Sequence, residues 1–173
     1  MGVLIFFLPS KYVSTGSFYI KRAADANTSF FTYEGYYGQQ TALSYTNTVV
    51  GLLESVDIQS KALNKLNIQV NEVSLRRYAK HIKAKKSGPQ LVALTVKGNT
   101  FSESKKLWEA VADELITVNQ QLNVNGDDKL NVSKISAQPV VKKEYKSLWL
   151  NIPAGILLAL CAGIFIVSFK EYD

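Results

Sequence analysis

The chain has 173 residues, a hydrophobic content of 47% and a net charge of +6 at pH 7, which is enough for one domain of ordinary size. The charge is modest for the length and does not by itself indicate a nucleic-acid partner. The only cysteine, Cys161, excludes an intrachain disulfide, and a site built on the only histidine, His81, would have few companions.

The chain begins with a short apolar segment, Val3 to Leu8, which has no basic region before it. It is too short for the apolar core of a signal peptide. Two interpretations stay open: a hydrophobic first strand, or the end of a first transmembrane helix that begins upstream of Met1. We favour the truncated helix because Pro9-Ser10-Lys11 is typical of an exit from the bilayer, and we assign it residues 1–9.

Periodicity and turn residues predict an alternation of strands and helices along the next part of the chain. The predicted elements are a strand over 12–21, a loop over 22–30, helices over 31–54, 55–66 and 71–84, a strand over 90–97, a helix over 100–122, a turn over 125–128 and a strand over 130–141. This order predicts an α/β domain over 10–147, with a small mixed sheet and packed helices.

Two helix starts carry local signals. Ser55 is a typical N-cap, and Thr100 with Glu103 forms a capping-box pattern in which hydroxyl and carboxylate each satisfy a backbone N–H. The helix that follows Thr100 is amphipathic. Its apolar stripe is formed by Leu107, Val111, Leu115, Val118 and Leu122.

The last segment, Leu148 to Phe169, is a run of 22 residues without a charge. A helix of that length spans about 33 Å, enough to cross a hydrocarbon core of about 30 Å. We therefore predict a C-terminal transmembrane helix over 148–169 and a short tail over 170–173. Gly155, Ala159 and Gly163 repeat every four residues, and such a ridge of small side chains favours a helix–helix contact in the membrane.

The densest charge lies between Arg76 and Lys86, which contains no acidic residue. The cations of this possible anion-binding patch are Arg76, Arg77, Lys80, Lys83, Lys85 and Lys86. Such a patch could dock on anionic headgroups or an acidic polysaccharide. A solvated helix face that leads into a strand is the simpler explanation. Nucleic acid is disfavoured as a partner, because neither a recognition fold nor a base-stacking platform accompanies the charge.

No constellation for catalysis is visible in the sequence. The acidic residues are scattered singly, Asp127 and Asp128 lack the ligand spacing of a calcium loop, and neither a P-loop nor a dinucleotide fingerprint is present. We therefore expect no catalytic residue, metal or cofactor, and a protein that is not an enzyme.

The order of the segments resembles a known family. The chain presents LPSKYVSTGSFYI, then FTYEGYYGQQTALSYTNTVVGLLES, then KKSGPQLVALTVKGNTFSESKKLWEAVADEL, and finally VSKISAQPVV before the apolar run. Each motif is weak, but their order is similar to that of the Wzz-type chain-length determinants of bacterial polysaccharides, the polysaccharide co-polymerases. The resemblance covers nearly the whole chain. It lacks the coiled-coil extension, the tyrosine-kinase domain and several prolines of larger members, so it suggests a short form.

This resemblance implies two transmembrane helices in the plasma (inner) membrane, an extracytoplasmic domain and a ring-like homo-oligomer. Such a ring would set the length of a polysaccharide made by a separate polymerase, so the implied partners are the bilayer, further copies, the polymerase and the growing polysaccharide. The lysines at 142, 143 and 146 would by themselves keep the domain cytoplasmic, although the rule weakens for long loops. The alternative is a membrane-anchored adaptor for a separate cytoplasmic partner, such as a capsule tyrosine kinase.

Overall fold

The computed structural model describes residues 11–23, 33–124 and 126–144, together with five helical residues at 156, 159–161 and 163. The chain divides into a compact unit, Tyr12–Lys143, and a second unit formed from the two chain ends. The first unit is the α/β domain considered below.

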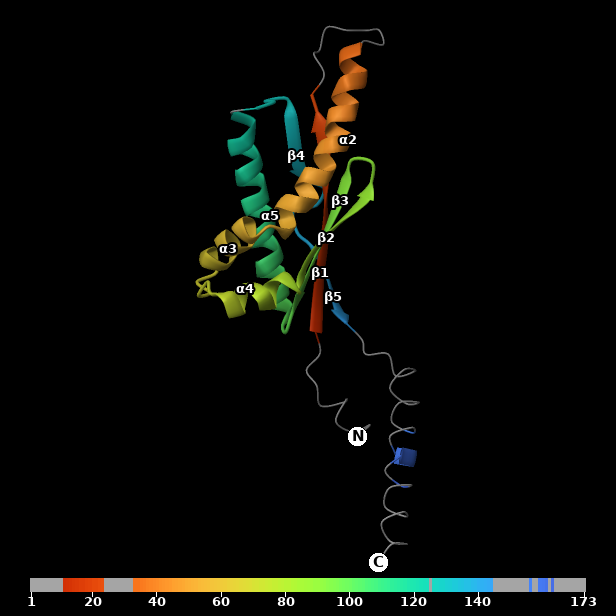
Figure 1. Ribbon diagram of the computed structural model, residues 1–173, viewed down its shortest axis with the longest axis vertical. Coiled ribbons are helices and arrows are strands. Elements are labelled where there is room, and N and C mark those ends of the chain that lie inside the picture. The colour runs from red at the N-terminus through yellow and green to blue at the C-terminus, as the bar shows by residue number, and fades with distance from the viewer. Residues whose placement is uncertain are drawn as a thin grey trace, which may run out of the picture. The chain divides into compact units, whose positions relative to one another are not determined.

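The domain combines an antiparallel sheet with four helices among its described residues (Figure 1). The elements in chain order are β1 (Lys11–Arg22), α2 (Tyr33–Glu54), α3 (Val56–Lys65), α4 (Glu72–Ala79), β2 (Ile82–Gly88), β3 (Leu91–Gly98), α5 (Phe101–Val124), β4 (Leu130–Lys134) and β5 (Val140–Glu144). Both predicted helix starts are confirmed. Ile58 N donates to Ser55 Oγ at 3.3 Å, and Glu103 N donates to Thr100 Oγ1 at 3.0 Å.

The sheet has the strand order β2-β3-β1-β4, and β5 also pairs with β1. It is antiparallel, so the mixed sheet predicted from the sequence is wrong. The reason is strand β2, which the sequence pattern missed. Because only Pro89 and Gln90 separate β2 from β3, these strands form a hairpin, and a hairpin is antiparallel.

The helix predicted over 71–84 ends at Ala79, since His81 turns the chain and Ile82 enters the sheet. Arg76, Lys80 and Lys83 therefore do not share a helical face, as the sequence had suggested. Lysine and alanine are good helix formers, so local propensity favoured a longer helix. Pairing of β2 with β3 and full burial of Ile82 outweigh that propensity.

The strand predicted over 130–141 is interrupted. β4 ends at Lys134 and β5 begins at Val140, with residues 135–139 between them. Ile135 N still donates to Ser17 O at 2.9 Å, but Pro139 has no N–H with which to continue a ladder. β4 and β5 therefore follow one another along the same long neighbour, β1.

The membrane-spanning part of the predicted fold is also corrected. Among the helices that the structure describes, none is both long enough and apolar enough to cross a bilayer. Residues 1–9 and most of residues 148–169 lie outside the described part of the chain.

One face of the sheet is buried beneath helices, and the other is not covered by any described residue. β3 alternates strictly, with Val92, Leu94 and Val96 fully buried and the intervening residues partly exposed. α2 and α5 pack on the buried face, and α3 packs on α5 (Figure 1). The alternation therefore defines a core face and an open face of the same sheet.

Trp108 of α5 is the largest fully buried side chain of the core. Its Nε1 donates to Leu94 O at 3.0 Å, and its ring stacks on Phe18 with the centroids 5.9 Å apart. The ring lies against Gly16 of β1, where an added Cβ would be 2.3 Å from Trp108 Cζ2. Residue 16 must therefore lack a side chain if α5 is to pack this close to the sheet.

Gly16→Ala should destabilise the domain because the new methyl overlaps the indole of Trp108. We expect a loss of about 1–3 kcal/mol, the usual cost of overpacking a core, in urea denaturation followed by circular dichroism. Gly51→Ala is the matched control. It lies on the exposed side of α2 with open space around its Cα, and should stabilise the protein by about 0.5–1 kcal/mol. Equal effects of the two substitutions would contradict this account of Gly16.

Candidate functional site

The six cations of the predicted patch fall into two groups. Arg76 and Arg77 occupy the last turn of α4, and Lys80 is its C-cap. Asn71 starts this helix through a capping box with Ser74. Cations at a helix C-terminus are favoured by the helix dipole, so the local fold itself stabilises this first group.

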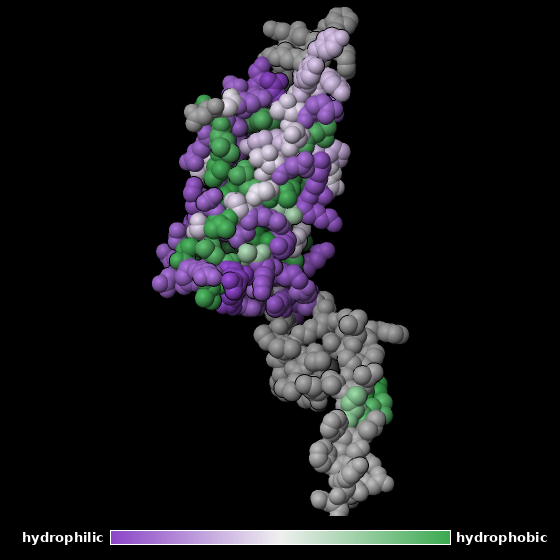
Figure 2. All heavy atoms as spheres, in the orientation of Figure 1, coloured by the Kyte–Doolittle hydropathy of each residue, from purple (hydrophilic) through white to green (hydrophobic). Residues whose placement is uncertain are grey.

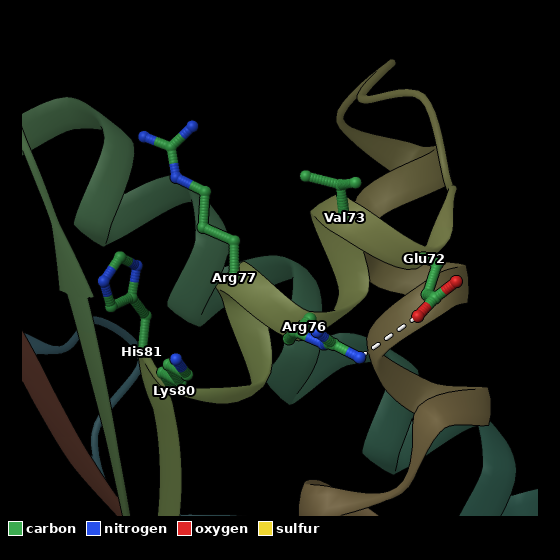
Figure 3. Close-up of a pocket in the computed structure, with 6 residues that line it drawn as sticks. All are labelled: Glu72, Val73, Arg76, Arg77, Lys80 and His81. Carbon is green, nitrogen blue, oxygen red and sulfur yellow. Dashed lines mark hydrogen bonds and ion pairs between the residues drawn. The ribbon is translucent and has the colours of Figure 1, made fainter.

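The first group borders a hollow of about 460 Å³ whose lining residues are drawn in Figure 3: Glu72, Val73, Arg76, Arg77, Lys80 and His81. Arg76 is engaged by Glu72, with Nη2 and Oε1 3.1 Å apart, and both side chains are largely exposed. In the close-up, Arg77 and Lys80 lie on the same side as the His81 ring. That ring meets Tyr78 edge-on at 6.4 Å. The hollow is therefore shallow, wet and cationic on one side.

The second group comprises Lys83, Lys85 and Lys86 of strand β2. Lys83 pairs with Thr95 and Lys85 pairs with Ala93, so both lie on the open face of the sheet. Lys86 pairs with Val92 of the core face but remains exposed at the sheet edge, beside an irregularity at Lys86–Gly88. Within the described part of the chain, these three ammonium groups form no ion pair. The structure thus places half of the predicted patch on a helix end and half on a strand.

A further hollow lies where β4 and β5 separate along β1, and the sequence analysis missed it. It measures about 420 Å³, and its lining residues are Thr15, Gly16, Ser17, Ile135, Ser136, Gln138, Val140 and Lys142. The available signals were hydroxyl residues at alternate positions of β1 and a proline inside the predicted return strand. Neither becomes a site until the strand break brings the two stretches together.

The carboxylates of the domain make structural contacts. Asp113 of α5 binds Lys134 of β4, and Lys65 of α3 lies 3.6 Å away. Burial alone would raise the pKa of Asp113, but the hydrogen bonds and charges of Lys134 and Lys65 outweigh it and lower that pKa. Asp113 therefore joins two helices to the sheet as a charged group.

The turn before β4 is held in the same way. Asp127 accepts from Arg22 Nε at 2.6 Å and from Lys129 N at 3.1 Å. The hydrogen bond from Arg22 is the main cause that lowers the pKa of Asp127. Glu54 accepts from Ala84 N at 3.0 Å at the edge of the sheet. These acidic groups therefore stabilise the fold at neutral pH.

The residues predicted to form a membrane contact are only partly described. Ala159 and Gly163 are helical and exposed, while Gly155 lies outside the described residues. A Cβ added at Gly163 would meet no atom within 4 Å. In the described part of the chain, no group of three or more His, Cys, Asp or Glu side chains is arranged to hold a metal ion.

Comparison of the chain with models of known protein families and with curated proteins gives no match.

Asp113→Asn should lower stability at neutral pH and weaken its dependence on acid. Because the carboxyl pKa is lower in the folded protein than its ordinary value of about 3.9, the charged network contributes stability above that value and loses it as pH falls through the folded pKa. Asp113 is nearly half exposed, so we expect less than about 1 kcal/mol at pH 7 and no difference below about pH 3.

Urea denaturation across this pH range measures the effect. Asp128→Asn is the control, since this exposed neighbour makes no ion pair with any described residue. A constant difference between Asp113→Asn and the parent at every pH would show that the side chain acts by packing and not by charge.

Proposed function

We propose that this protein is a non-catalytic scaffold that regulates chain length in the biosynthesis of a bacterial surface or extracellular polysaccharide. The order of its segments carries the proposal. A first strand and a long helix are followed by a strand–turn–helix unit, β3 to α5, and by a return strand interrupted at Pro139. This is the order of the segments that resemble polysaccharide co-polymerases.

The way the chain enters and leaves the sheet supports the proposal. β5 pairs antiparallel with β1, so Tyr12 at the start of the domain and Lys143 at its end lie at the same end of the sheet. A domain with this arrangement can be held against a surface by both ends at once. We place it at the extracytoplasmic side of the plasma membrane, with the bilayer as one of its partners.

A scaffold of this kind acts by position and not by bond chemistry. The proposed partners are further copies of the chain, a separate polymerase and the growing polysaccharide. The acidic residues of the sheet region support a structural role, because Asp113, Asp127 and Glu54 each satisfy a named group of the fold. Polymer length would then follow from how long the assembly retains a polymerase or a chain.

Deletion of the gene should leave polysaccharide synthesis intact but shift or broaden its length distribution, because a scaffold sets length without forming bonds. Gel analysis of the polymer from the producing bacterium measures this. Complementation with His81→Ala should restore the parental distribution, since no catalytic role is assigned to His81. Complete loss of polymer in the deletion strain, or in a stably folded His81→Ala strain, would contradict the proposal.

The proposed location makes Asn99 accessible from outside the cell. Asn99 is exposed in the turn between β3 and α5, and Asn99→Cys in a Cys161→Ser background places one thiol there. Intact cells should be labelled by a membrane-impermeant maleimide, and the Cys161→Ser parent should not. Labelling only after lysis would place the domain in the cytoplasm and favour an adaptor for a separate partner.

A further inference from the structure

The open face of the sheet carries lysines and hydroxyls in aligned rows. Strand register places Lys83, Thr95 and Thr15 in one row, and Lys85, Ala93 and Ser17 in the next. None of these residues is buried. Neighbouring strands lie about 4.8 Å apart, so each row runs across three strands from the lysine edge to β1. Figure 2 shows hydrophilic side chains gathered along the margin that carries β2 and β3.

The rows end at the hollow between β4 and β5. Thr15 and Ser17, the last residues of the two rows, are also lining residues of this hollow. Beyond them it offers the hydroxyl of Ser136, the amide of Gln138 and the ammonium of Lys142. A continuous track therefore crosses the sheet, over about 14 Å from β2 to β5, with cations at both ends and neutral polar groups between them.

We infer that this track binds a strand of acidic polysaccharide, with the lysines at its two ends pairing with carboxylates or phosphates of the polymer. The inference rests on the proposed function and names the ligand of its scaffold. Charge complementarity selects a polyanion, because no described acidic side chain pairs with Lys83 or Lys85. Hydroxyl and amide groups both donate and accept hydrogen bonds, as sugar hydroxyls require.

The shape of the track favours a polymer chain over a membrane surface. The flat lipid headgroup layer cannot enter the hollow at the strand break, whereas an extended sugar chain can. Ile135 and Val140, which are more than half exposed, give this hollow an apolar wall against which the C–H face of a sugar ring can pack. A surface helix or strand that binds lipid presents large apolar side chains outward. The middle of the track instead presents Thr15, Ser17, Ala93 and Thr95.

The test is binding of purified full-length protein to polygalacturonate, a linear polyanion of uronic acids, with uncharged dextran as the reference polymer. Lys83→Gln/Lys85→Gln should weaken binding by about fivefold, the scale expected for two exposed ion pairs. Lys61→Gln/Lys106→Gln removes the same charge from the exposed surfaces of α3 and α5 and should change binding by less than about twofold. Equal losses in the two double variants would overturn the inference.

A second pair of variants separates specific contact from attraction by net charge. Thr15→Val/Ser17→Ala keeps the charge and the strand propensity of β1, and should weaken binding by about threefold through lost hydrogen bonds. Ser44→Ala/Thr48→Val removes matching hydroxyls from the exposed side of α2 and should have no effect. Thermal unfolding of all variants shows whether each is folded. Unchanged binding by folded Thr15→Val/Ser17→Ala would overturn the track as the site.

Vesicles that contain anionic phosphatidylglycerol test the membrane as the occupant. If Lys83→Gln/Lys85→Gln loses vesicle binding but retains polygalacturonate binding, the face is a lipid-docking surface and the inference is wrong. The inference and the proposed function fail separately. Altered polymer length in the deletion strain together with equal binding by all variants removes only the polysaccharide track. Normal polymer length together with selective loss of binding removes only length control.

Discussion

The contact between Gly16 and Trp108 determines how closely the helical layer approaches the sheet. β1 is the central strand, paired with β3 on one side and with β4 and β5 on the other, so α5 must pack against its middle. A residue without a side chain lets the indole lie directly on the β1 backbone while its N–H reaches the carbonyl of Leu94. Phe18, Leu107 and Val111 then complete a core with one close-packed face.

This one-sided packing leaves the opposite face of the sheet available. In β1 and β3 the residues that point away from α5 are small or polar, and none of them is buried. Alternation of this kind is usual where an antiparallel sheet has one solvated face. Here the solvated face also collects lysines from β2. The core packing and the proposed polysaccharide track are therefore two results of the same alternation.

Local signals in the sequence were reliable where the chemistry is local. Ser55 and Thr100 cap helices as predicted, because a cap depends on residues within one turn. The apolar alternation of β3 likewise marked a strand. β2 was missed because an edge strand buries little, and Ile82 is its only fully buried residue. The lysines of Ile82–Lys86 satisfy a helical pattern as well as an extended one, and only pairing with β3 decides between them.

The candidate site depended on such non-local facts even more strongly. The basic run could be read directly from the sequence, but its division into a helix end and a strand could not. Gly16 and Trp108 are 92 positions apart, and no local pattern connects them. The hollow beside Thr15 needs both the register of β1 and the break at Pro139. These features arise when distant segments pair, which is why composition and periodicity did not indicate them.

The two edges of the sheet also limit how copies of this domain can join. On one edge the outward N–H of Ala84 is taken by Glu54, and the lysines of β2 repel an approaching strand of the same kind. On the other edge residues 135–139 interrupt the ladder, and Pro139 offers no donor. Among the described residues, neither edge is a continuous template for another strand. Neighbouring copies would therefore have to meet through side chains, which leaves each sheet closed and its open face free to point toward a common lumen.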